Sequence, residues 1–522
     1  MTPAPDPRPR PLDHLAERGE GDAPALVLRG RTLNHQDLRT RVGRLAAWLA
    51  SRASEGERVA SWAAKGEATC LLPLACARAG IVHVPINPLL KRMQVAHILA
   101  DSGASLLIAS RARLASLEAD DVPPGCAVVV EEEFWSEVDA HAPLGPSDRD
   151  PAELAAILYT SGSTGKPKGV MLPWRSIEAN TEMVDALLHL RPSDVMLGVL
   201  PFFHTFGYTI TLWTMLAMGV GAVFHTNPLE SRVIGRLMRE RGVTIVLGTP
   251  TLLRAYMRRL EPEDFATVDI VAAGSERLPN AVIDAFEEKI GVRPFQGYGA
   301  TELGPIVSAN VPASRAQGDP ARSLREGTVG RPALGVRVQV RDPETGKILG
   351  PNERGVLWVT GPHVMLGYLN RPDLTEQVVV DGWYNTGDVV TIDEDGFITI
   401  VGRESRFAKI GGEQVPFAAI EEALAALTGG SEDGAPRAVV TAVPDDASGE
   451  RLVVVHTELD ATPAELVKGM ADLGLPRLFL PSPADFHPID VMPLIGIGKV
   501  DLEAINRIAL DAAATRRAKA KS

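Results

Sequence analysis

The stretch Tyr159-Thr160-Ser161-Gly162-Ser163-Thr164-Gly165-Lys166-Pro167-Lys168-Gly169 combines hydroxyl groups, glycines and two lysines in one short segment. A buried strand is predicted before it, at residues 155–159, and a returning strand after it, at residues 170–172. Glycines let backbone N–H groups approach oxyanions closely, and hydroxyl and ammonium groups add further donors. The pattern therefore predicts a polyphosphate-binding loop between two strands.

Two other interpretations of this loop are weaker. A plain Gly/Ser surface turn would not need so many hydrogen-bond donors. A Walker loop requires glycine, four residues, then Gly-Lys-Ser/Thr running into a helix. Here Gly162 and Gly165 are only three positions apart, Lys166 is followed by Pro167, and a strand pattern comes next. A P-loop kinase is therefore disfavoured.

Length and composition restrict the class of protein. The chain has 522 residues, which exceeds one ordinary core and predicts two or three structural units. A net charge of −13 argues against nonspecific nucleic-acid binding. The isolated Cys70, Cys76 and Cys126 lack metal-ligand spacing and indicate a reduced, cytoplasmic compartment. Residues 1–24 show no signal-peptide pattern, and the apolar run at 206–224 favours a buried helix and turn over a membrane span.

Strand and helix patterns alternate along most of the chain. A hairpin is predicted at residues 25–33, and Asn34 is expected to cap a helix that runs to about residue 50. Further strands are predicted at 58–62, 81–85, 105–109, 195–200, 221–224, 245–247 and 269–273, with helical segments between them. This order predicts an α/β fold of layered, doubly wound, largely parallel sheets.

The last third of the chain has a different pattern. Strands at 336–340, 355–359 and 397–401 predict a small antiparallel β unit, and a further section of strand and helix patterns follows. We expect a large N-terminal domain at residues 1–402 and a smaller, mobile α+β C-terminal domain at residues 403–522, with a hinge near Ser405. The basic tail from Thr515 is expected to be solvated.

Several separated motifs occur in an order known from one enzyme superfamily. They are residues 159–169, Leu200-Pro201-Phe202-Phe203-His204-Thr205-Phe206-Gly207, Gly297-Tyr298-Gly299-Ala300-Thr301-Glu302, Tyr384-Asn385-Thr386-Gly387-Asp388, Gly402-Arg403 and Gly496-Ile497-Gly498-Lys499. Together they resemble the adenylate-forming, acyl-activating enzymes, over nearly the whole chain. Residues 406–413 and 475–494 look most like the synthetase part of bacterial acyl-acyl carrier protein synthetases.

The resemblance implies a reaction in which a carboxylate and ATP give an acyl-adenylate and pyrophosphate, followed by capture of the acyl group by a thiol. Carboxylate and triphosphate repel each other, so the site must supply positive charge and alignment. By resemblance, the loop residues Thr160, Ser161, Gly162, Ser163, Thr164, Gly165 and Lys168 wrap the β- and γ-phosphates. Thr301 would contact the α-phosphate, and Glu302, with Thr160, would hold Mg²⁺. For Glu302 the simpler alternative is a carboxylate at a helix start.

Other motif residues are expected around the nucleoside. Tyr298 would stack on adenine, near Gly299 and Ala300, while the segment Gly274-Ser275-Glu276 would pass close to the base. Asp388 would accept the ribose hydroxyls, although an Asp after Gly is often only a turn former. Arg403 would reach the ribose or a phosphate, with a salt bridge near the hinge as its alternative.

Two residues are expected to act on the carboxylate. Lys499 lies in a glycine-flanked loop, and the family places such a lysine at the α-phosphate and the attacking carboxylate, where it offsets developing charge. His204 would lie beside the acyl carboxylate, or else be a buried core histidine. This chain departs from the family at Ser405 and Arg406, and Trp174 replaces a frequent histidine and could alter access to the acyl channel.

The acid and the thiol are predicted less directly. Amino-acid-activating relatives have an Asp near the His204 motif, which is absent here, and acetate-activating relatives have a Trp where this chain has Gly299. A medium- or long-chain fatty acid is therefore predicted. The thiol belongs to phosphopantetheine, of holo-acyl carrier protein or of coenzyme A, with a slight preference for the carrier protein. Residues 403–522 carry 13 Lys/Arg against 18 Asp/Glu, so any docking patch for a carrier protein would be local, for example at Arg406, Lys409 or Arg477.

No transmembrane segment is expected, and peripheral membrane contact is left open. Two functions outside ligase chemistry also remain open. A kinase-like ATPase would release ADP rather than AMP, and a non-catalytic nucleotide-binding relative would show no acid-dependent pyrophosphate exchange.

Overall fold

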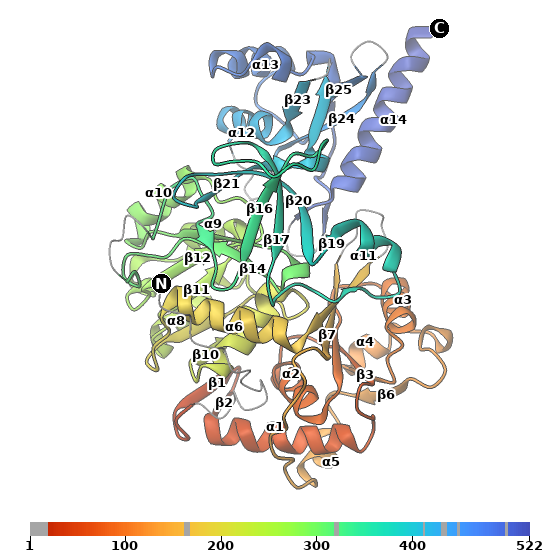
Figure 1. The fold of residues 1–522 in the computed structure, drawn as a ribbon, viewed down its shortest axis with the longest axis vertical. Helices are drawn as coiled ribbons and strands as arrows, with labels where there is room; N and C mark the ends of the chain where they lie inside the picture. The colour runs from red at the N-terminus through yellow and green to blue at the C-terminus, as the bar shows by residue number, and fades with distance from the viewer. Residues whose placement is uncertain are drawn as a thin grey trace.

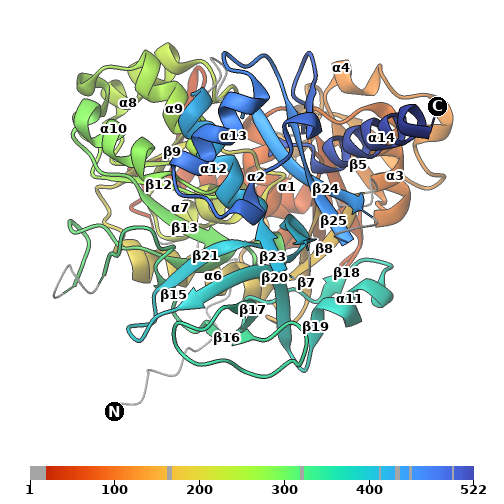
Figure 2. The same cartoon turned by 90° about the horizontal axis from the view of Figure 1, so that it is seen from above.

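The computed structural model describes residues 19–160, 167–317, 323–410, 413–429, 436–445, 449–495 and 499–521. For residues 405, 409, 414, 495, 499 and 515–521 only the backbone is described. The body of the molecule contains two large sheets, and the C-terminal elements lie above it (Figure 1). Seen from above, α12 (Phe417–Thr428), α13 (Pro463–Asp472) and α14 (Leu502–Lys521) lie over the larger part (Figure 2).

One large sheet contains the strands on either side of the predicted phosphate loop. In the described part of the chain it has seven strands in the order β18-β8-β7-β4-β3-β5-β6. Their bounds are β3 Arg58–Trp62, β4 Val82–Pro85, β5 Leu106–Ala109, β6 Ala127–Val130, β7 Leu154–Thr160, β8 Lys168–Pro173 and β18 Gly367–Tyr368. The strands from β7 to β6 are parallel and nearly fully apolar, as expected for strands covered on both faces. Antiparallel pairing of β7 with β8 places Thr160 opposite Lys168 across the loop.

The second large sheet supplies most of the other predicted site segments. Its nine described strands follow the order β15-β14-β13-β12-β11-β9-β10-β1-β2. Their bounds are β1 Pro24–Leu28, β2 Arg31–Asn34, β9 Val195–Gly198, β10 Gly221–Phe224, β11 Ile245–Gly248, β12 Ile270–Ala273, β13 Phe295–Gly299, β14 Ile306–Ala309 and β15 Arg331–Pro332. The strands from β13 to β1 are parallel, and antiparallel strands close both edges.

Helices surround these sheets, and except for α4 they bury residues in the core. They are α1 His35–Ala50, α2 Glu67–Ala79, α3 Arg92–Ser102, α4 Arg111–Leu114, α5 Trp135–Asp139, α6 Trp174–Leu188, α7 Met215–Ala217, α8 Ser231–Arg241, α9 Pro250–Arg259 and α10 Asn280–Ile290. The side chain of Asn34 accepts a hydrogen bond from the backbone N–H of Asp37 at 2.7 Å, so the predicted helix cap is confirmed.

A smaller sheet and the C-terminal domain complete the fold. The smaller sheet contains β16 Arg337–Arg341, β17 Gly355–Thr360, β19 Val379–Val380, β20 Trp383–Ile392 and β21 Ile398–Arg403, beside α11 Pro372–Val378. The C-terminal sheet contains β22 Phe407–Ile410, β23 Glu413–Pro416, β24 Ala438–Asp445, β25 Gly449–His456 and β26 Phe486–Pro488, and the short pair β27 Leu494–Ile495 and β28 Lys499–Val500 follows. The small antiparallel unit was predicted, and its pairing is confirmed.

The predicted fold class is confirmed, with one difference in detail. The apolar run that begins at Phe206 forms a buried helix as predicted; it is a π-helix, Phe206–Thr214, in which the Thr211 and Thr214 hydroxyls donate to backbone carbonyls. In the C-terminal domain β24 and β25 pair directly as antiparallel neighbours, instead of being joined through a helix. No helix among the described residues is long and apolar enough to cross a membrane.

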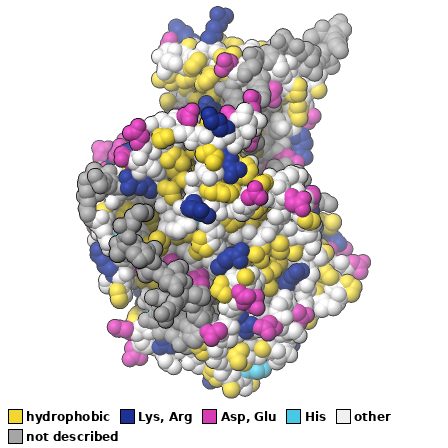
Figure 3. Space-filling view, in the orientation of Figure 1, with side chains coloured by type: hydrophobic (Ala, Val, Ile, Leu, Met, Phe, Trp, Pro, Cys, Tyr) yellow, Lys and Arg dark blue, Asp and Glu magenta, His cyan; other side chains and the backbone are white. Residues whose placement is uncertain are grey.

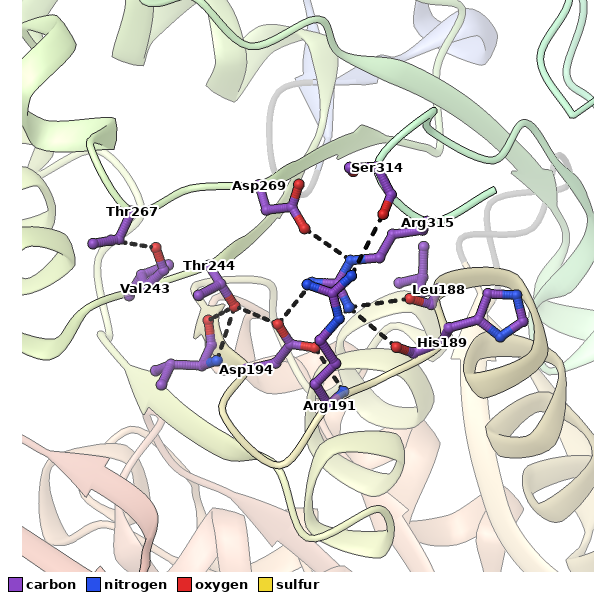
Figure 4. Close-up of polar contacts among 11 residues, drawn as sticks. Leu188, His189, Arg191, Asp194, Val243, Thr244, Thr267, Asp269, Ser314 and Arg315 are labelled. Atoms are coloured by element: carbon purple, nitrogen blue, oxygen red, sulfur yellow. Dashed lines mark hydrogen bonds and ion pairs between the residues drawn. The ribbon is translucent and has the colours of Figure 1, made fainter. Parts of the chain in front are cut away.

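A buried ion-pair network fastens the amino ends of three parallel strands. Asp194, Thr244 and Asp269 directly precede β9, β11 and β12; Arg315 bonds to the two aspartates, and Thr244 joins the network through Asp194 (Figure 4). Arg315 donates to Asp194 at 2.7 Å and to Asp269 at 2.8 Å, and Thr244 donates to Asp194 at 3.0 Å. The side chains of Arg315 and Asp194 are only 1% and 3% exposed, so each charge depends on the other for solvation.

We predict that Arg315→Met destabilises the protein by about 3–5 kcal/mol, because Asp194 would be left charged and buried. Urea unfolding followed by circular dichroism measures this effect. Arg293→Met is the matched control, because Arg293 also makes several ion pairs but with exposed carboxylates. Equal midpoints for the two variants would contradict the prediction.

Candidate active site

A large cleft gathers the predicted site segments at the carboxyl ends of the parallel strands. Segments that follow β9, β11, β12 and β13 line it on one side, and residues of the C-terminal domain line it on the other. Ligands of open α/β sheets bind at this edge. The sequence-predicted residues that line the cleft are Thr160, Lys168, His204, Gly274, Ser275, Glu276, Tyr298, Gly299, Ala300, Thr301, Glu302, Asp388 and Arg403.

The remaining predicted residues cannot be placed in the same detail. Ser161, Gly162, Ser163, Thr164 and Gly165 lie outside the described residues, as do residues 496–498. Lys499 begins β28 and pairs with Ile495, and its side chain is outside the described part. Its neighbour Val500 lines the cleft, so the chain carries Lys499 close to the cleft wall.

Glu302 lies in a contact that joins the two large sheets. Its carboxylate accepts a hydrogen bond at 2.7 Å from the hydroxyl of Tyr368, which belongs to β18 of the seven-stranded sheet. The ammonium group of Lys168 lies 4.7 Å from the centroid of the same Tyr368 ring, a cation–π contact. Burial raises the pKa of the Tyr368 hydroxyl, and the Glu302 carboxylate raises it further, so this hydroxyl stays a donor.

The turn that carries Thr301 and Glu302 is held from behind by Asn180. The Asn180 side chain is fully buried; it donates to the carbonyl of Leu303 at 3.0 Å and accepts from the N–H of Ile306 at 2.7 Å. One amide therefore satisfies backbone groups on both sides of the turn. Asn180 fixes the turn from α6 without lining the cleft in the described structure.

Asp388 already has two donors in this structure. Arg403 donates to it through Nε at 2.8 Å, and the hydroxyl of Tyr298 also donates to it. The Asp388 carboxylate raises the pKa of Arg403, while burial and then Asp388 raise the pKa of Tyr298. Arg403 thus forms the salt bridge that the sequence left open as its alternative role. Ribose hydroxyls at Asp388 would replace or share these donors.

A half-buried lysine supports the loop that carries His204. Lys65 donates to the carbonyls of Gly198 and Leu200 at 2.6 and 2.7 Å, and its ammonium group lies 4.8 Å from the centroid of the Phe202 ring. Burial lowers the pKa of Lys65 to about 7. The contacts tie the end of β3 to the end of β9, directly before His204.

Gly299 has a packing role that the sequence did not indicate. A Cβ at this position would lie 2.0 Å from the carbonyl oxygen of Pro305, where β13 and β14 approach closely. Trp174 is only 4% exposed and packs edge-to-face on Trp213, with ring centroids 5.9 Å apart. It is absent from the described cleft lining, so this structure places it in the core rather than at the channel.

The protein oxygen atoms near Glu302 suit a hard cation whose other ligands come mainly from a bound nucleotide. Within the described residues no group of three or more His, Cys, Asp or Glu side chains could hold a metal ion. Glu302 uses one oxygen for Tyr368 and keeps the other for a further partner. One or two protein oxygens, with phosphates and water, are the usual ligands of Mg²⁺ at nucleotide sites. The residues present therefore fit Mg²⁺ that arrives with ATP.

Comparison with known proteins gives the family. The sequence pattern described as AMP-binding enzyme matches residues 12–369, more than half of the chain. This chain belongs to the AMP-binding enzyme family. It is an acid–thiol ligase that forms an acyl-adenylate with ATP.

Relatives with known activities resemble the chain over most of its length. The fatty acid–acyl-carrier-protein ligase ScoC of Streptomyces coeruleorubidus is 32% identical over 507 residues, covering 92% of each chain. A feruloyl-CoA synthase of Amycolatopsis is 30% identical over 482 residues, covering 90% of this chain and 93% of the relative. A long-chain-fatty-acid–CoA ligase of Yersinia pestis is 28% identical over 526 residues, covering 92% of this chain and 90% of the relative.

Solved structures share the fold. ATP-bound MatB of Rhodopseudomonas palustris superposes with a TM-score of 0.84 at 27% identity, covering 95% of this chain and 98% of MatB. MenE of Bacillus subtilis, solved with ATP and a magnesium ion, gives a TM-score of 0.79 at 22% identity, covering 94% of this chain and 98% of MenE.

Sequence reasoning missed three residues that support the candidate active site. Tyr368 lies in a two-residue strand, too short to show periodicity. Asn180 lies inside an amphipathic helix, and Lys65 looks like an ordinary surface lysine in a loop. The glycine of Gly367-Tyr368 was the one local signal, because a glycine in a strand often marks a close approach of another backbone.

We predict that Tyr368→Phe lowers acid-dependent ATP–pyrophosphate exchange about 10- to 100-fold. The variant keeps the ring beside Lys168 and removes only the hydrogen bond to the Glu302 carboxylate, a loss of about 1.5–3 kcal/mol. Tyr159→Phe is the matched control, because its hydroxyl bonds to Asp101 instead of Glu302. Exchange by Tyr368→Phe at the level of this control would contradict the role.

We predict that Lys65→Met raises the KM for the acid by about tenfold or more and leaves the KM for ATP within about twofold. Losing the two hydrogen bonds from the Lys65 side chain would let the His204 loop move, at a cost of about 1 kcal/mol or more per bond. Steady-state exchange kinetics test this, with melting curves to confirm folding. Parallel changes in both KM values would point to a general loss of structure.

Proposed function

We propose that this ligase activates a medium- or long-chain fatty acid with ATP and transfers the acyl group to a phosphopantetheine thiol, with holo-acyl carrier protein as the preferred acceptor. The observation that carries the proposal is the cleft, which combines the phosphate-loop flanks Thr160 and Lys168 with Glu302 and Asp388, and with apolar walls. The similarity to ScoC supports the fatty acid and the carrier protein.

The apolar walls support an alkyl chain. Val184 and Leu187 of α6 and Ile210 of the π-helix line the cleft, and the π-helix begins two residues after His204. A carboxylate beside His204 would therefore have its chain near these side chains, with about 0.8 kcal/mol gained per buried methylene. No acidic residue occurs at positions 200–207 to pair the ammonium group of an amino acid.

In the first half-reaction a carboxylate oxygen attacks the α-phosphorus of ATP, and the bond to pyrophosphate breaks. Thr160 and Lys168, with Ser161 to Gly165, hold the leaving phosphates, and Thr301 orients the α-phosphate. Glu302 and Thr160 hold Mg²⁺, which offsets phosphate charge when it is bound. Lys499 offsets the charge shared by the carboxylate and the α-phosphate.

The nucleoside is held by a second group of residues. Tyr298, Gly299 and Ala300 flank adenine on one side and Gly274 to Glu276 on the other, and Asp388 and Arg403 hold the ribose. In the second half-reaction the thiol sulfur attacks the acyl carbon, the thiol proton is lost, and AMP leaves.

The two half-reactions need different surfaces, so we propose that residues 403–522 rotate on residues 1–402 around a hinge near Ser405. The contact between Arg277 and Glu422 joins the two parts at 3.0 Å, and both side chains are about 60% exposed. Such a pair contributes little to stability, so it allows the rotation.

Coenzyme A is the alternative acceptor. Arg406 donates to Glu421 at 2.5 Å, so it is already paired and does not offer the docking charge that the sequence suggested. Positive and negative side chains are interspersed on the face in Figure 3, with no broad basic area for an acidic carrier protein.

Buried, unpaired Cys70 and Cys76 support a cytoplasmic location.

Acid-dependent ATP–pyrophosphate exchange across an acid panel tests the proposal, with the released nucleotide identified. We predict highest exchange with C8–C18 fatty acids and AMP as the product; greater activity with acetate or an amino acid, or release of ADP, would refute it. Ferulate belongs in the panel because feruloyl-CoA synthases are among the relatives. Thioester formation with holo-carrier protein and with coenzyme A then identifies the acceptor.

We predict that Lys499→Ala lowers pyrophosphate exchange by about 10²–10³-fold and leaves ATP binding unchanged, because the lysine acts on charge that develops in the transition state. Lys468→Ala is the control, since Lys468 is an exposed lysine of the same domain. Equal exchange in the two variants would remove Lys499 from the mechanism.

A further inference from the structure

Two arginines of α9 face the cleft one helical turn apart. Thr249 caps α9, and Leu252, Leu253 and Tyr256 bury its other face. Arg254 and Arg258 both line the cleft, and residues four positions apart lie on the same side of a helix. Figure 1 shows α9 on the side of the large body below α12.

Neither guanidinium has a hydrogen-bond or ion-pair partner within the described residues. Other arginines that line the cleft do have carboxylate partners: Arg277 with Glu422, Arg293 with Glu326, Arg325 with Asp395, Arg403 with Asp388, Arg406 with Glu421 and Arg437 with Asp460. Arg254 and Arg258 therefore differ from the rest of the cleft.

This arrangement costs free energy in the absence of an anion. Arg254 is half-buried; burial lowers its pKa, attraction to Glu276 opposes that shift, and repulsion from Arg258 adds to it. Glu276 accepts a hydrogen bond from the Thr251 hydroxyl at 3.2 Å. Like charges one turn apart and a partly desolvated cation are both unfavourable until an oxyanion binds between them.

The surrounding sequence is basic in an acidic protein. Residues 231–260 contain seven arginines and one acidic residue, Glu240, whereas the whole chain has a net charge of −13. The positive electrostatic potential of α8 and α9 therefore attracts anions, whereas the net negative charge of the whole chain repels them.

We propose that Arg254 and Arg258 form an oxyanion-binding site in the cleft for a substrate group other than the ATP triphosphate. Two guanidinium groups suit phosphate or carboxylate, which they bind through paired N–H donors. The proposed triphosphate residues Thr160 and Lys168 belong to the seven-stranded sheet, whereas α9 follows β11 of the nine-stranded sheet. The inference rests on the proposed function, because it assigns the anion to one of that reaction's substrates.

Two substrates could supply the oxyanion. One source is the phosphate of the phosphopantetheine donor, and the other is a second carboxylate at the far end of the acid. Arg254→Gln and Arg258→Gln remove the charge and keep helix propensity. Arg254→Lys keeps the charge and loses the paired donors, and Arg259→Gln is the control, because Arg259 is exposed on the same helix and absent from the described cleft lining.

The kinetic test separates the sources. If the phosphate binds here, the glutamine variants raise the KM for coenzyme A or holo-carrier protein by about tenfold or more, while the KM for pantetheine and pyrophosphate exchange stay unchanged. If a carboxylate binds here, the KM for an α,ω-dicarboxylic acid rises and that for the matching monocarboxylic acid does not. Arg254→Lys is expected to restore part of the loss.

The assignment would be overturned if both glutamine variants kept unchanged KM values, or if only the KM for ATP changed. It would also be overturned if Arg259→Gln changed the same KM values equally. Calorimetric binding of coenzyme A and of dodecanedioate needs no turnover, so it tests the site even if the variants or the wild type lack exchange. Absence of acid-dependent exchange in the wild type would refute the proposed function. Normal wild-type exchange with no effect of either arginine would refute only this site.

Discussion

The contact among Lys168, Tyr368 and Glu302 joins the two large sheets at the cleft. Lys168 and Tyr368 belong to the seven-stranded sheet, whereas Glu302 follows β13 of the nine-stranded sheet. A carboxylate and an ammonium group thus share one tyrosine, through a 2.7 Å hydrogen bond and a cation–π contact. Because the groups proposed to bind phosphate and metal come from different sheets, their relative position depends on this contact and on the turn that Asn180 holds.

In the nine-stranded sheet, the residues that stabilise the fold and the residues that line the cleft lie at opposite ends of the strands. At the amino ends of its strands Arg315 and Asp194 form a buried pair joined by two hydrogen bonds, and neither residue is among the described residues that line the cleft. At the carboxyl ends the charges are less completely matched, as the pair Arg254 and Arg258 shows. Such unpaired charge lowers stability, and it is found where a substrate can compensate it.

The sequence predicted the features that local pattern encodes. Apolar strands such as 58–62, the Asn34 cap and the ordered motifs led to the fold class and the family, both of which are confirmed. It could not predict contacts between distant segments. Lys65 lies 133 positions from Gly198, Asn180 lies 123 positions from Leu303, and neither pairing has a local signature. The roles of Glu302, Asp388 and Lys499 remain predictions, and the loop from Ser161 to Gly165 lies outside the described residues.

The central claim is that one cleft brings two mutually repelling anions, a carboxylate and the α-phosphate of ATP, into bonding distance. Isotope transfer from the acid measures this directly. A fatty acid labelled with ¹⁸O in both carboxylate oxygens is incubated with the enzyme, ATP and the thiol acceptor, and the AMP is analysed by mass spectrometry. Attack by the carboxylate predicts one ¹⁸O atom in each AMP released with thioester. Unlabelled AMP, or label in inorganic phosphate instead, would contradict the account.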